Sequence, residues 1–169
     1  MSFTISRAVN SFKVFENIKL GNGIKNADGF RQSIKSNRMR VSHYAENLLG
    51  SSSFAVAAEE ILVDLVKVPV GELGFDVARR KEIYAKAVGV FGFQICPAEV
   101  GPQFRLQNKN QPHGERLIVG MEPIIGLNRR PELFVIENSN DLWLRTFCDG
   151  THFYWKGAQH FLFILPRRQ

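Results

Sequence analysis

The sequence predicts an α+β protein in which N-terminal helices pack on a mainly antiparallel C-terminal sheet. Apolar residues recur at helical spacing in the first part of the chain, whereas a period of two prevails after Pro97. Turn residues separate the alternating segments, as is typical of antiparallel sheets. The length of 169 residues suits one domain, because domains commonly contain about 100–200 residues. We expect a candidate extended arm (residues 1–25), a mainly helical part (26–92) and a mainly β part (93–169).

The chain begins with an extended segment and a first helix. Residues 12–20 mix apolar and polar side chains in a strand-like manner, and Gly21-Asn22-Gly23 interrupts them. The helix begins near Asn26 or Asp28, because either side chain can accept a hydrogen bond from the first turn. It stops at Ser36.

A second short helix is predicted from Ser42, an N-cap candidate, to Gly50. With residues 37–41 as the loop, the two helices have the outline of a helix-turn-helix. The next segment fits two structures. Residues 55–60 favour a helix, whereas the β-branched residues of 63–70 favour a strand, with Pro69 at its end or at a sheet edge.

Later elements follow from periodicity alone. The clearest helical pattern covers residues 77–90, with apolar and charged residues on opposite faces. Alternation then predicts strands around residues 104–107, 117–121, 133–137, 142–147 and 161–165. We expect Trp143 to point into the core from its strand, and Trp155, in a polar loop, to be exposed.

The charge of the chain is concentrated near its N-terminus. Lys and Arg total 22 and Asp and Glu total 16, which gives a net charge of +6. Residues 1–50 contribute +5, residues 51–100 contribute −2 and residues 101–169 contribute +3. Such asymmetry is typical of surfaces that bind nucleic acid or an acidic partner, although a basic surface without a partner has the same composition.

We therefore expect a binding protein without enzymatic activity that engages nucleic acid or an acidic protein. Its predicted contacts are Lys25, Arg31, Lys35, Arg38, Arg40 and Trp155. One alternative is a small hydrolase-like enzyme with Cys148, Asp149 and His152 as nucleophile, acid and base, although the same loop is more simply a turn. Another alternative is a protein–protein adaptor that uses the C-terminal sheet edge or Trp155.

Metal and cofactor chemistry has no sequence support. The four histidines are widely separated and no HxxxH, HExxH or CxxC spacing occurs, so we predict no metal site and no cofactor. Glu99 and Glu122 form a candidate carboxylate pair, for which a salt bridge or a backbone cap is the stronger interpretation.

The compartment follows from the cysteines and the apolar segments. Cys96 and Cys148 are predicted to be reduced thiols in a cytoplasmic protein, with Cys96 in the core. The N-terminus lacks the apolar segment of a secretory signal. No apolar stretch approaches the ~20 residues of a membrane-spanning helix, so we expect no membrane association.

Several runs of sequence resemble, in the same order, stretches of other proteins. They include CPAEVGPQFRLQ at residues 96–107, Met121-Glu122-Pro123-Ile124 and Leu142-Trp143-Leu144. These runs resemble an uncharacterised family of small bacterial proteins, and the similarity spans residues 16–168. The resemblance implies a bacterial protein and brings no activity, cofactor or site residue with it.

Overall fold

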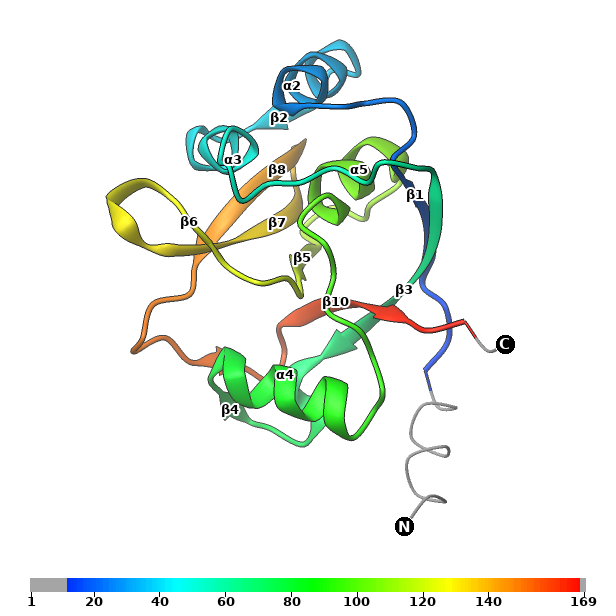
Figure 1. Cartoon of the computed structure of the whole chain (residues 1–169). Coiled ribbons are helices and arrows are strands. Elements are labelled where there is room, and N and C mark those ends of the chain that lie inside the picture. Colours follow the sequence, from blue (N-terminus) through cyan, green and yellow to red (C-terminus); the bar gives the residue numbers. More distant parts are fainter. Residues whose placement is uncertain (1–11, 168–169) are drawn as a thin grey trace.

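The computed structural model describes residues 12–167, so the first part of the predicted arm lies outside the described residues. Its centre is a curled sheet of eight strands (Figure 1). In order across the sheet these are β1 (Glu16–Leu20), β3 (Ile61–Pro69), β10 (His160–Leu165), β5 (Arg116–Val119), β7 (Pro131–Ser139), β8 (Asp141–Cys148) and β2 (Arg40–Val41), and β6 (Ile124–Ile125) pairs with β7. The pairs β10–β5 and β2–β8 are parallel and the others antiparallel, so the sheet is mixed.

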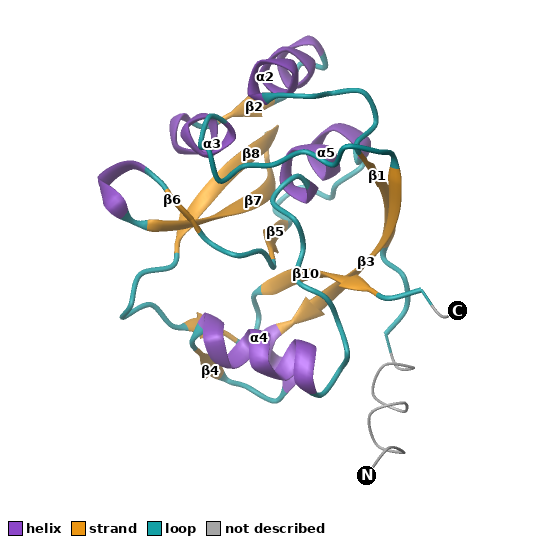
Figure 2. Cartoon of the chain, viewed as in Figure 1, coloured by secondary structure: helices purple, strands orange, loops and turns teal. Residues whose placement is uncertain are grey.

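Helices lie at two ends of this sheet. The helices are α2 (Ala27–Ser36), α3 (His43–Leu49), α4 (Arg80–Gly89) and α5 (Val100–Gln107), with 3-10 turns at Val70–Leu73 and Leu127–Arg129. Helices α2 and α3 lie together at one end, whereas α4 lies at the other end beside the small sheet of β4 (Val77–Ala78) and β9 (Trp155–Lys156) (Figure 2).

The α+β class is confirmed, but its elements are distributed differently from the prediction. Strand β3 lies within residues 26–92 and helix α5 within residues 93–169, so neither part is uniform. The sheet also takes β1 and β3 from the N-terminal half of the chain, so it is not a purely C-terminal sheet.

Local capping explains where the first two helices begin. The Asn26 side chain accepts a hydrogen bond from Gly29 N at 2.9 Å, and Ser42 Oγ accepts one from Ala45 N at 3.2 Å. Each bond satisfies a first-turn N–H group that has no partner within the helix. Both predicted helix starts are confirmed.

The ambiguous segment before Val70 is a strand. Strand β3 pairs with β1 on one side and β10 on the other, and Leu65 and Val66 are fully buried. Val63 and Val68 are buried as well, whereas Asp64 and Lys67 between them are only half-buried, so the valines and leucines of residues 63–68 belong to the core. Pro69 ends the strand, as predicted, and the helix favoured by residues 55–60 is absent.

The strand predicted around residues 104–107 is wrong, because this segment is helix α5. The alternation of Phe104 and Leu106 with Arg105 and Gln107 is misleading, because Arg105 is fully buried whereas Gln107 is exposed. Val100 and Phe104 are both fully buried at the four-residue spacing of a helix. Pro102 is tolerated because it lies in the first turn.

Buried Glu99 fixes the start of α5 to two distant segments of the chain. Its Oε1 accepts a hydrogen bond from Gly21 N at 2.7 Å, and its Oε2 accepts one from Ala57 N at 2.8 Å. The backbone-cap interpretation of Glu99 is therefore confirmed. Glu122 is exposed.

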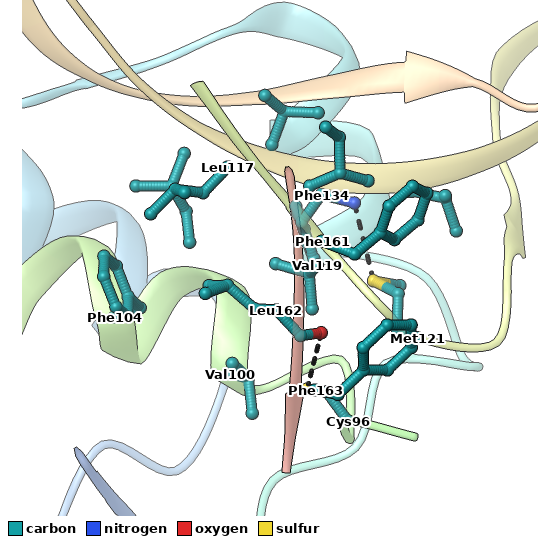
Figure 3. Packing of buried hydrophobic residues seen from close by; sticks show 14 of the residues in the cluster. Cys96, Val100, Phe104, Leu117, Val119, Met121, Phe134, Phe161, Leu162 and Phe163 are labelled. Carbon is teal, nitrogen blue, oxygen red and sulfur yellow. Dashed lines mark hydrogen bonds between the residues drawn. The ribbon is translucent and has the colours of Figure 1, made fainter. Parts of the chain in front are cut away.

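The core surrounds β10. Val100 and Phe104 of α5 lie on one side of this strand, and the Phe161 and Phe163 rings lie on the other (Figure 3), where they pack against Tyr84 of α4. Cys96 is 3% exposed, and its Sγ donates a hydrogen bond to the Leu162 carbonyl at 3.4 Å. Burial raises the pKa of the Cys96 thiol well above its ordinary value. The predicted core position of Cys96 is confirmed.

Candidate functional site

The register of the sheet gathers side chains from four strands into one row. Glu137 of β7 is paired with Arg116 of β5 and with Trp143 of β8, and Trp143 is paired with Arg40 of β2. Directly paired residues of neighbouring strands point to the same face. The Trp143 ring and the Arg40 guanidinium therefore share a face at the β2 edge of the sheet.

Two guanidinium groups lie over the Trp143 ring. Arg145 Cζ is 3.9 Å from the ring centroid, and Arg40 Cζ is 5.6 Å from it. Both distances fall within the ~6 Å range of cation–π interactions. The prediction that Trp143 belongs to the core is wrong, since its neighbour Leu144 takes the fully buried face of β8 and leaves Trp143 half-buried.

A hollow of about 550 Å³ lies beside this ring, between α2 and the edge strand β2. Its basic lining residues are Arg31 and Lys35 of α2 and Arg40 of β2. Arg31 and Lys35 are four residues apart, so they project from one side of the helix. The fold thus brings three of the predicted contact residues together with an aromatic ring.

Acidic groups partly neutralise these cations. Arg31 Nη1 is 2.7 Å from Asp28 Oδ1, and Arg40 Nε is 2.7 Å from Asp141 Oδ2. Exposed ion pairs of this kind contribute about 0–1 kcal/mol, so another anion can replace either carboxylate at little cost. Within residues 12–167, Lys35 has no salt-bridge partner.

The other two predicted basic contacts lie outside the hollow. Lys25 precedes α2 and Arg38 follows it, and both side chains are exposed without lining the hollow. Arg38 adopts a φ of 59°, which turns the chain from α2 into β2. The N-terminal charge is therefore divided between the hollow and the surrounding surface.

Trp155 is not an exposed contact, and this prediction is wrong. Its side chain is fully buried, with its ring centroid 4.9 Å from that of Phe161 and 5.0 Å from that of Phe147. Its Nε1 donates a hydrogen bond to Asp149 Oδ1 at 2.9 Å. A buried indole needs such an acceptor, so the polar loop serves the ring instead of exposing it.

The candidate enzyme residues are adjacent in sequence but do not form a catalytic arrangement. The two oxygens of the Asp149 carboxylate accept hydrogen bonds from Arg80 Nε and Trp155 Nε1. His152 is exposed, and among the hydrogen bonds of the described residues none joins Cys148, Asp149 and His152 to one another. The loop is held as a structural turn.

The described residues contain neither a metal-binding cluster nor a membrane-spanning helix. Between residues 12 and 167, no three His, Cys, Asp or Glu side chains gather closely enough to hold a metal ion. None of the helices in that range has the length and apolar character needed to cross a bilayer.

Comparison with known proteins gives one result. No family model, curated protein or solved structure matches the chain. The resemblance to a bacterial family therefore stays a prediction, and the site must be interpreted from its own geometry.

Sequence reasoning missed one basic cluster. Arg79, Arg80 and Lys81 form a charge run that was visible in the sequence, and they line a second hollow together with Asp149. The run of three basic residues is the signal in the sequence. The sequence does not show that Arg80 pairs with the distant buried carboxylate of Asp149.

Proposed function

We propose that the hollow beside Trp143 binds a single strand of nucleic acid. The observation that carries this proposal is the convergence of Arg31, Lys35 and Arg40 with a half-buried tryptophan on one hollow. The protein acts by binding, and the two free cysteines fit the reducing conditions of the cytoplasm.

The side chains match the two parts of a nucleotide. Guanidinium and ammonium groups bind backbone phosphates, whereas aromatic rings and arginine planes stack against unpaired bases. Stacking of one base contributes about 1–3 kcal/mol. The Arg145 guanidinium already lies over the Trp143 ring, so a base can extend this stack or replace its outer member.

A single strand fits the structure better than a duplex read by a helix. Helix α3, the second helix of the supposed helix-turn-helix, has the sequence HYAENLL and contains no Lys or Arg. The loop before it is paired to the sheet as β2. A recognition helix in the major groove is normally supported by basic side chains that bind the flanking phosphates, and α3 has none.

Binding of a fluorescein-labelled single-stranded oligonucleotide, DNA or RNA, measured by fluorescence anisotropy tests the proposal. We expect Trp143→Ala to weaken binding by about tenfold, since it removes one stacking contact, and Trp143→Phe to weaken it less. Lys35→Gln should also weaken binding. Lys13→Gln is the matched control, because it removes the same charge outside both this hollow and the basic run at Arg79–Lys81 and should leave the affinity unchanged.

Circular dichroism of each variant separates loss of binding from loss of structure. Absence of binding to both DNA and RNA at low salt would overturn the proposal. Equally tight binding of a polyglutamate peptide of the same charge would overturn it in favour of an acidic protein partner.

A further inference from the structure

A second hollow, of about 240 Å³, lies at the start of α4, away from α2 and α3 (Figure 1). It is lined by the basic run Arg79, Arg80 and Lys81, by Pro131 at the start of β7, and by the loop from Asp149 to Phe153. None of these residues lines the Trp143 hollow.

The Arg80 side chain is held in place from several sides. Its Nε donates to Asp149 Oδ2 at 2.6 Å, and the second oxygen of that carboxylate is bound by the buried Trp155. Its guanidinium carbon lies 5.2 Å from the centre of the Tyr84 ring. Because Asp149 engages only Nε, the two terminal NH₂ groups of Arg80 remain for another partner.

The neighbouring cations complete the lining. Arg79 Nη2 donates to the Tyr154 hydroxyl at 2.9 Å, and the Arg79 guanidinium lies over that ring. Lys81 is exposed and has no salt bridge within residues 12–167. The lining thus contains three cationic side chains and one carboxylate, that of Asp149, so the hollow has a surplus of positive charge.

The size and chemistry of the hollow define its ligand. Pockets for larger organic ligands measure about 300–1,000 Å³, so a hollow of about 240 Å³ suits a small anion. A guanidinium held by a carboxylate, next to an exposed ammonium group, is well suited to phosphate oxygens. Phe153 and Pro131 offer an apolar wall to whatever carries the phosphate.

We propose that this hollow binds a phosphate group, either free or as a small monoester. The bound phosphate accepts hydrogen bonds from the terminal NH₂ groups of Arg80 and from Lys81. This site is separate from the nucleic-acid hollow, so either proposal can fail without the other.

Isothermal titration of the full chain with inorganic phosphate and with phenyl phosphate tests this inference. We expect saturable binding at one site and a loss of about tenfold in affinity for Lys81→Gln, because one charged contact is removed. Lys13→Gln, which removes an exposed charge outside both hollows, is the matched control and should bind as the wild type does. Tighter binding of phenyl phosphate indicates a monoester ligand, and tighter binding of inorganic phosphate indicates the free anion; both support the site.

Two results would overturn it. One is the absence of heat with either compound at millimolar concentration. The other is equal weakening by Lys81→Gln and Lys13→Gln, which would mean that the phosphates respond only to net charge. Thermal unfolding of both variants confirms that each is folded.

Discussion

Replacement of Asp149 by Asn tests the network that joins α4 to the β8–β9 loop. The asparagine side chain keeps the shape of the aspartate but removes its charge and one acceptor. Either the Arg80 guanidinium or the Trp155 indole then faces an NH₂ group instead of an oxygen. The Arg80 cation is left without a carboxylate in a largely buried position.

The magnitude follows from the burial of the pair. Breaking a buried ion pair by removing one partner costs about 3–5 kcal/mol. Here the exposed fractions of the Arg80 and Asp149 side chains are 16% and 8%, so some water reaches the orphaned cation. We expect Asp149→Asn to lower the free energy of unfolding by about 2–4 kcal/mol, which a domain stable by about 5–15 kcal/mol survives.

Urea unfolding at neutral pH, followed by far-UV circular dichroism, measures this loss. Asp141→Asn is the matched control, because it breaks the ion pair with Arg40, whose members are 47% and 59% exposed. That variant should lose less than about 1 kcal/mol. The reasoning is refuted if Asp149→Asn is no less stable than Asp141→Asn.

Two further predictions concern packing and acid stability. An added Cβ at Gly101 would lie 2.8 Å from Phe134 Cβ. Gly101→Ala should therefore lower the free energy of unfolding by about 1–3 kcal/mol. An unchanged midpoint of urea unfolding would contradict the close contact of α5 with β7. Hydrogen bonds from Arg167 hold the pKa of Asp64 below its ordinary value. The pair therefore stabilises the fold at a pH above the ordinary aspartate pKa, and this stabilisation disappears as the pH falls through the lowered pKa of the folded state. Arg167→Gln should raise the pKa of Asp64 toward that of a free aspartate, as followed by NMR of its carboxyl carbon, and an unchanged pKa would contradict the assignment.

Local signals in the sequence predicted the elements that depend on local chemistry. The caps at Asn26 and Ser42 act within one turn of their helices. Alternation and turn residues located strands after residue 116, although the centres of β7 and β10 are buried on both faces. Helix α5 was mistaken for a strand because Arg105 is fully buried. Its guanidinium donates to Gln111 and to the carbonyl of Asn108, and no periodicity rule anticipates such partners.

Only part of the candidate site could be predicted from the sequence, for the same reason. Arg31, Lys35 and Arg40 were identified from charge alone, because an excess of basic residues in one segment can be counted without tertiary contacts. The predicted helical surface is only partly helical, since Arg40 lies in strand β2. The exposure of the two tryptophans was predicted the wrong way round. That of Trp143 depends on the pairing of β8 with β2, and that of Trp155 on the position of Asp149. Both are tertiary facts that the sequence does not show.

The salt dependence of nucleic-acid binding tests the central claim most directly. For single strands, the logarithm of the binding constant falls with the logarithm of salt concentration with a slope of about −0.7 per phosphate contact. With Arg31, Lys35 and Arg40 as the contacts, the wild type should show a slope of about −2 and Lys35→Gln a slope of about −1.4. A slope near zero, or the same slope for both proteins, would contradict binding at this hollow.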